Sequence, residues 1–189
     1  IVFITFGSLA ILARFIEPAV FGTFALLLAI HVMLYTFIDF GLTPVFVKRD
    51  HVDDQIKNVF YTFNILLGLL YSLLFILISI FINQESFVLY ACIFIFSGIL
   101  TSINQQPLAN LVRENKQKEI MILQTISYFF AALTAVIMAM NGFSIYALIA
   151  QHLSQPILQY LIIRTYQIHK HKLQPFSILK KYTNEIRFA

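Results

Sequence analysis

The chain has 189 residues, of which 59% are hydrophobic and 12% are charged, with a mean hydropathy of +0.81 and a formal net charge of +4. Soluble domains are about half apolar and a quarter charged, so this composition excludes an ordinary soluble domain. It predicts an all-α polytopic membrane protein, in which apolar runs of about 20 residues cross the bilayer as helices.

The opening run, residues 1–13, is apolar but too short to cross a bilayer. It has neither the basic flank nor the small-residue cleavage site of a signal peptide. We therefore expect the second half of a membrane helix whose start is missing. Arg14 follows this run, and Pro18 marks the expected first turn of the next helix.

Five longer apolar runs follow, bounded by charged or turn residues, at 20–47, 59–82, 87–103, 120–140 and 143–163. Each has the length of a tilted spanning helix once the first is trimmed. With the opening helix they predict a six-helix transmembrane bundle over residues 1–164, followed by a basic cytoplasmic connector over residues 165–189. The polar stretches between the runs, including residues 104–119, are expected to be loops.

Asp39 lies inside the first long run. A carboxylate away from water must be protonated, paired or hydrated. Gly41 and Pro44 follow closely and predict a helix that is bent or loosened there. Two interpretations stay open. Asp39 pairs with a basic residue such as Arg113, or with freed backbone N–H groups, as part of a hinge; alternatively, it couples transport to protons or substrate.

The last apolar run, residues 143–163, contains several polar residues. Gln151, Gln155 and Gln159 recur at four-residue spacing and share one helix face, with His152 beside them. Such a stripe should face away from lipid, and either interhelical hydrogen bonds or a water-filled pathway for sugar hydroxyls would explain it. Pro156 predicts a kink in the same helix.

His31 and His152 are the two histidines predicted to lie within membrane helices. An unperturbed imidazole titrates near neutrality, so each is a candidate for a proton relay as well as for hydrogen-bonded packing. Cys92 is the single cysteine, which excludes an intramolecular disulfide.

The distribution of cations predicts the orientation. Among the connections expected on the outside, only the first contains a cation, Arg14; every other Lys and Arg lies in the second and fourth connections or in the C-terminal tail. Positively charged flanks stay in the cytoplasm, so we expect both the N-terminus and the tail to be cytoplasmic. A basic tail beside an anionic inner leaflet explains the net charge without a nucleic-acid partner.

Motifs for catalysis are missing from the sequence. It has no GxxxxGK[ST], GxSxG, HExxH or CxxC pattern. We expect no enzyme activity, no metal site and no cofactor.

Two early segments, LARFIEPAVFG and FIDFGLTPVFVKR, resemble bacterial O-antigen and exopolysaccharide flippases of the oligosaccharide flippase family. In that family the first external loop reads LAR, then Pro, then FG, and the second helix ends in D-x-G-L before basic residues. The matching positions are Leu12, Ala13, Arg14, Pro18, Phe21, Gly22, Asp39, Gly41, Leu42, Lys48 and Arg49. Residues 103–120 and 141–153 are similar to the family's fourth loop and its fifth-to-sixth helix turn.

The resemblance implies one half of a 12–14 helix multidrug/oligosaccharidyl-lipid/polysaccharide exporter fold, so the chain would be a fragment. It also implies translocation of undecaprenyl-pyrophosphate-linked sugar repeats across the bacterial inner membrane by alternating access. The expected partners are the lipid-linked oligosaccharide, membrane lipids, and polysaccharide polymerases and glycosyltransferases.

Two sets of candidate residues follow. The candidate cavity or substrate residues are Arg14, His31, Asn64, Gln151, His152 and Gln155; the candidate gate or hinge residues are Asp39, Gly41, Pro44 and Pro156. Binding of a pyrophosphate group is expected to need cationic side chains, yet no Lys or Arg lies inside a predicted helix. Either other parts of the protein supply them, or the substrate is held chiefly through its sugars.

Two alternatives remain. A cation-coupled multidrug or metabolite exporter of the same superfamily would use Asp39 as its coupling acid. A non-transporting scaffold of a polysaccharide assembly complex would have its Gln151–Gln159 stripe packed shut.

Overall fold

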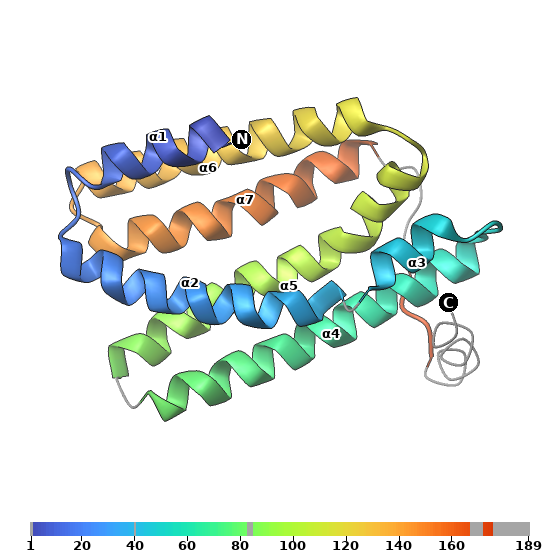
Figure 1. The fold of residues 1–189 in the computed structure, drawn as a ribbon, viewed down its shortest axis with the longest axis horizontal. Helices are drawn as coiled ribbons and strands as arrows, with labels where there is room; N and C mark the ends of the chain where they lie inside the picture. The colour runs from blue at the N-terminus through green and yellow to red at the C-terminus, as the bar shows by residue number, and fades with distance from the viewer. Residues whose placement is uncertain (1, 40, 83–84, 167–171, 176–189) are drawn as a thin grey trace.

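The computed structural model describes residues 2–39, 41–82, 85–166 and 172–175, with the side chains of residues 37–39, 85 and 166 excepted. The described residues form helices and no strand (Figure 1), so the predicted all-α class is confirmed. The helices are α1 Val2–Leu12, α2 Pro18–Asp39, α3 Leu42–Lys48, α4 Asp54–Phe81, α5 Glu85–Arg113, α6 Gln117–Met140 and α7 Ser144–Tyr166.

Four of the described helices, α2, α4, α5 and α6, are long and apolar enough to cross a membrane. Helix α7 has 23 residues but carries the glutamines, His152 and Pro156, and α1 has only 11 residues. The polar residues of α7 can be kept away from lipid because α7 packs between α6 and α5. Large apolar side chains such as Phe3, Phe81 and Leu161 are exposed, as expected of surfaces that face lipid.

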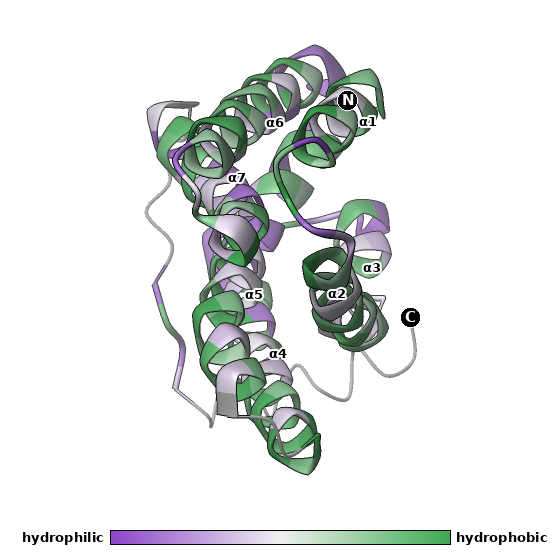
Figure 2. Ribbon diagram, turned by 90° about the vertical axis from the view of Figure 1, so that its left-hand side faces the viewer, coloured by the Kyte–Doolittle hydropathy of each residue, from purple (hydrophilic) through white to green (hydrophobic). Residues whose placement is uncertain are grey.

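The helices do not pack in chain order. Helix α1 lies along α6, α6 along α7, α7 along α5, α5 along α4, and α4 along α2. Figure 2 shows α1 and α6 at one end of this row and α2 near α4 at the other. Helix α2 also contacts α5 and α7, so α1 and α2 approach the central α5–α7 pair from different sides.

The predicted helix over residues 20–47 is two helices in the structure. Helix α2 ends at Asp39, and Gly41 adopts a left-handed backbone with φ 78° as the N-cap of α3. Glycine accepts this conformation without the steric cost that a Cβ would bring. Pro44 lies in the first turn of α3, where a helix does not need the N–H that proline lacks. The prediction that the chain is loosened here is confirmed.

The predicted loop over residues 104–119 is mostly wrong, because α5 continues through Pro107 to Arg113. Asn104, Gln106 and Asn110 are buried, and the Asn104 Nδ2 donates to the Pro156 carbonyl of α7 at 2.9 Å. Interhelical hydrogen bonds of this kind let a polar stretch remain helical inside a bundle. The polar residues in this stretch therefore indicate a contact between helices and not a loop.

Short turns join α5 to α6 and α6 to α7. Asn115 and Gly142 adopt positive φ angles of 56° and 81° directly after the ends of α5 and α6. At each turn the next N–H donates back to a helix carbonyl: Lys116 to Leu111 at 3.0 Å, and Phe143 to Met138 at 3.0 Å. These are Schellman caps, which end a helix while satisfying its last carbonyl groups.

Arg113 holds α3 against the end of α5. Its guanidinium donates to the carbonyl oxygens of Phe46, Val47, Arg49 and Asp50, the bonds to Phe46 and Val47 measuring 3.3 and 3.2 Å. These groups lie at and just beyond the C-terminus of α3, where orphan carbonyls favour a cation. The described partners of Arg113 are thus backbone groups, and the Asp39 carboxyl of the predicted pair lies outside the described side chains.

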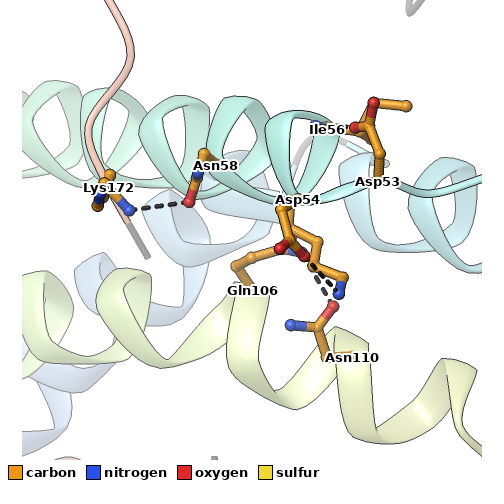
Figure 3. A network of polar contacts seen from close by, with 8 residues as sticks. Asp53, Asp54, Ile56, Asn58, Gln106, Asn110 and Lys172 are labelled. Carbon is orange, nitrogen blue, oxygen red and sulfur yellow. Dashed lines mark hydrogen bonds and ion pairs between the residues drawn. The ribbon is translucent and has the colours of Figure 1, made fainter. Parts of the chain in front are cut away.

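Apart from Arg14, the Lys and Arg residues in the described helices and turns gather at one end of the molecule. There α3, the start of α4, the end of α5, the start of α6 and the end of α7 lie close together (Figure 1). Arg14, between α1 and α2, lies at the opposite end. At the cation-rich end, Asp53 caps α4 by accepting a hydrogen bond from the Ile56 N–H at 2.7 Å. Part of the predicted connector lies along α4 at this end, where the Lys172 N–H donates to Asn58 Oδ1 at 2.8 Å (Figure 3).

Candidate functional site

A cavity of about 410 Å³ lies between α1, α2, α5, α6 and α7. This volume falls within the range of about 300–1,000 Å³ that is typical of small-molecule sites. Its walls are formed by Thr5, Leu28, His31, Val32, Tyr35, Ser97, Thr101, Gln105, Leu108, Gln124, Tyr128, Ala131, Gln151, His152, Gln155 and Gln159.

Helix α7 provides one wall through its polar stripe. Gln151, Gln155 and Gln159 line the cavity together with His152, as their four-residue spacing on one helix face requires. Gln151 also reaches α1, where its Nε2 donates to Ser8 Oγ at 3.0 Å. The stripe thus borders open volume in the described structure.

Helices α5 and α6 contribute polar residues that the sequence reasoning missed. Ser97, Thr101 and Gln105 on α5 are spaced four residues apart, as are Gln124 and Tyr128 on α6. The same spacing rule that found the α7 stripe could have found them. The signal is weak in the sequence, because single Ser or Thr residues are common in membrane helices and the polar composition of residues 104–119 favours a loop.

His31 lies in an aromatic wall on the α2 side. Its Nδ1 is 2.6 Å from the Tyr71 hydroxyl of α4, and its ring stacks on Tyr35 with centroids 5.7 Å apart. Both His31 and His152 pack on Phe94, at centroid distances of 5.0 and 5.6 Å. The two predicted histidines are thus brought to one side of the cavity by a shared aromatic residue.

Glycine makes room for the Tyr71 contact. A Cβ added at Gly98 of α5 would lie 2.1 Å from Cε1 of Tyr71, well inside van der Waals distance. Tyr71 can therefore cross the α5 surface only because residue 98 has no side chain. Gly98, Tyr71 and His31 form a chain of contacts from α5 through α4 to the cavity wall on α2.

Helix α7 continues through Pro156, and α5 compensates for the missing backbone N–H. The His152 carbonyl would accept that N–H in an unbroken helix. Instead Ser97 Oγ of α5 donates to it at 2.9 Å. Asn104 Nδ2 donates to the Pro156 carbonyl itself, also at 2.9 Å. These two bonds fix the depth and rotation of the glutamine stripe relative to α5.

The remaining candidate residues do not line this cavity. Arg14 is exposed in the α1–α2 connection, and Asn64 is 2% exposed within α4, its Oδ1 without a partner in the described part of the chain. Gly41 and Pro44 belong to the α2–α3 junction. The Asp39 side chain lies outside the described residues, so its predicted role is untested.

The described lining of the cavity is polar and lacks strongly acidic and strongly basic side chains. None of the described residues that line it is an Asp, Glu, Lys or Arg. Charged side chains instead lie at the ends of the helices, as the arrangement of α3 and the starts of α4 and α6 shows. The site can therefore offer hydrogen bonds and aromatic surface to a ligand, and its ionisable side chains other than tyrosine are His31 and His152 among the described lining.

Comparison with known protein families gives a match over most of the chain. The profile of a protein family described as "Polysaccharide biosynthesis protein" matches residues 11–188. No curated protein and no solved structure matches the chain.

Proposed function

The chain belongs to the family of polysaccharide biosynthesis proteins, and from this premise we propose that it is a flippase that moves lipid-linked oligosaccharide repeat units across the bacterial inner membrane. The substrate class proposed is the undecaprenyl-pyrophosphate-linked repeat of an O-antigen, capsule or exopolysaccharide. A role in polysaccharide biosynthesis follows from membership of the family. The translocation step and the substrate are what we propose.

One observation supports translocation most directly: a polar cavity lies between α1, α7 and three helices, α2, α5 and α6, that are apolar enough to span a membrane. A glycan crossing hydrocarbon would leave its hydroxyls without hydrogen-bond partners, at several kcal/mol for each group. A cavity lined by amides and hydroxyls replaces the lost water. Exposing such a cavity to one side of the membrane and then to the other is the general scheme of alternating access.

The orientation proposed places the cation-rich end in the cytoplasm, because positively charged flanks remain on that side. Loading would then occur at the end formed by α3 and the starts of α4 and α6. Arg113 holds α3 at that end through backbone carbonyls, so α3 is proposed to border the cytoplasmic opening.

Two alternatives have less support. The scaffold hypothesis requires the α7 stripe to be packed shut, whereas Gln151, Gln155 and Gln159 border the cavity. The cation-coupled exporter would use Asp39 as its coupling acid; the Asp39 side chain lies outside the described residues, and the described lining adds no other carboxylate.

Deleting the gene in its native host tests the flippase proposal. We expect surface polysaccharide to be lost and lipid-linked repeat units to accumulate on the cytoplasmic face, since synthesis of the repeat continues without its export. Reintroducing the gene should reverse both effects. Unchanged surface polymer, or repeat units that still reach the outer face, would overturn the proposal. Dye efflux measured in the same strains tests the exporter alternative.

A further inference from the structure

Three glutamines of the cavity have unused hydrogen-bonding capacity. Gln124, Gln155 and Gln159 make no hydrogen bond to any other described residue, although all three border the cavity. Gln159 is only 5% exposed. A buried polar group is normally hydrogen-bonded, so an amide held in this state needs a partner from the cavity, either water or a ligand.

The chemistry of these amides matches hydroxyl groups. Each glutamine side chain presents two N–H donors and a carbonyl acceptor, and each sugar hydroxyl is both a donor and an acceptor. Gln155 and Gln159 are one helical turn apart on α7, while Gln124 approaches from α6. The three can therefore bind hydroxyls along one side of an extended ligand.

The opposite wall is aromatic. His31 and Tyr35 stack with an interplanar angle of 29°, and both line the cavity. An aromatic face offers an apolar surface next to polar edges. Sugar rings also combine an apolar C–H face with polar hydroxyl edges, so a ring could pack on this wall while its hydroxyls face the amides.

The absence of Lys and Arg from the described lining of the cavity selects against anions. A diphosphate carries charge that must be paired when water is removed, for which Arg and Lys are the usual partners. No Lys or Arg is among the described residues that line the cavity. Acidic sugars meet the same obstacle, because an unpaired carboxylate in a low-dielectric site is costly.

We propose that this cavity binds the uncharged glycan portion of the substrate through the amides of Gln124, Gln155 and Gln159, and that it excludes the diphosphate and acidic sugars. The inference rests on the proposed function for the identity of the ligand. It deepens that function by assigning the neutral sugars to this cavity and the anionic linker to another part of the transport path.

Fluorescence titration of the full-length protein in nanodiscs tests the proposal. The described chain contains no Trp, so Tyr128→Trp places a single reporter from this chain in the cavity wall. The probes are neutral trisaccharides, namely chitotriose and maltotriose, together with trigalacturonic acid and inorganic pyrophosphate. We expect saturable binding of at least one neutral probe, with the two anions at least tenfold weaker. Calorimetry with the unaltered protein provides a second readout.

Paired variants link the binding to the amides. Gln155→Leu combined with Gln159→Leu should weaken binding of the neutral probe at least tenfold, and apolar replacements suit a membrane helix. Gln55→Leu, on an exposed residue in the first turn of α4, is the matched control and should leave binding unchanged. The inference would be overturned if pyrophosphate bound as tightly as the neutral probes, or if no neutral probe bound. It would also be overturned if the double variant left the affinity for the neutral probe unchanged.

The flippase proposal and the glycan-site proposal can be disproved independently of each other. If gene deletion stops export but no neutral glycan binds this cavity, the glycan assignment is wrong and the flippase stands. If neutral glycans bind through the amides but deletion leaves the surface polymer unchanged, the sugar site stands and the flippase is wrong.

Discussion

Arg113 illustrates how one side chain can fix a short helix. It donates to carbonyl groups at the end of α3, a helix of seven residues that would be marginal alone. Removing the guanidinium leaves these carbonyl groups without their donor. A buried hydrogen bond from a charged donor contributes about 1.5–3 kcal/mol to stability, and less where water competes for the acceptor.

We therefore expect Arg113→Ala to detach α3 and to increase protease cleavage between residues 41 and 54, while the membrane helices stay intact. Arg113→Lys should rescue only partly, because an ammonium lacks the planar donor geometry. Lys118→Ala, an exposed cation in the first turn of α6, is the control. Limited proteolysis in detergent measures the effect, and a cleavage pattern shared with the control would show that Arg113 does not anchor α3.

Gly98 carries a second prediction at the residue scale. A Cβ at this position would collide with the Tyr71 ring and displace the hydroxyl that contacts His31 Nδ1. Gly98→Ala should lower thermal stability by an amount typical of core overpacking, about 1–3 kcal/mol, and should reduce transport. Gly22→Ala is the control, since nothing lies within 4 Å of a Cβ there. Stability and transport equal to the control would contradict the proposed contact chain.

At the scale of elements, the α5–α7 pair decides where the cavity lies. Proline in α7 frees the His152 carbonyl, and Ser97 of α5 satisfies it. Asn104, in the polar stretch of α5, adds a second bond between the two helices by donating to the Pro156 carbonyl. These two bonds hold the glutamine stripe in register with α5, and the first of them uses the carbonyl that the proline leaves without its backbone donor.

A double-mutant cycle tests this pairing. Ser97→Ala alone should cost about 0.6–1.7 kcal/mol, the range found for hydrogen bonds between membrane helices. In a Pro156→Ala background the cost should fall towards zero, because residue 156 then supplies its own N–H to the His152 carbonyl. Ser127→Ala, which removes a bond within α6 only, should cost the same in both backgrounds. Additive effects of Ser97→Ala and Pro156→Ala in thermal unfolding would disprove the compensation.

The described cations are distributed unequally between the two ends of the molecule: one end is rich in Lys and Arg, and Arg14 lies at the other. The α5–α6 turn lies at the cation-rich end, and the α6–α7 turn lies at the other end of α6 (Figure 1). The orientation proposed from this asymmetry makes these two turns accessible from opposite sides of the membrane.

Cysteine labelling tests the orientation. In a Cys92→Ala background, Asn141→Cys should react with a membrane-impermeant maleimide in cells whose outer membrane is permeabilised, since it lies in the exposed α6–α7 turn. Glu114→Cys, in the α5–α6 turn, should react only after the inner membrane is opened. The reverse pattern would invert the proposed topology and place the cation-rich end outside.

Several features follow from the sequence alone because they depend on local composition and geometry. Apolar runs identified the helices, and the Asn-Gly pair after Met140 marked a turn that is observed. Gly41 and Pro44 indicated the break between α2 and α3, since one residue permits positive φ and the other cannot donate. The four-residue spacing of the α7 glutamines placed them on one face before any partner was known.

Only the tertiary structure decided which of these faces meet. That α5 extends to Arg113, that its Ser97 and Asn104 bond the backbone of α7, and that Gly98 admits Tyr71 all depend on residues more than 25 positions apart along the chain. Partition of a helix into a membrane depends on its own apolar residues, so the sequence determines it. A cavity depends on which neighbours leave space between them, and that is a property of packing between distant helices.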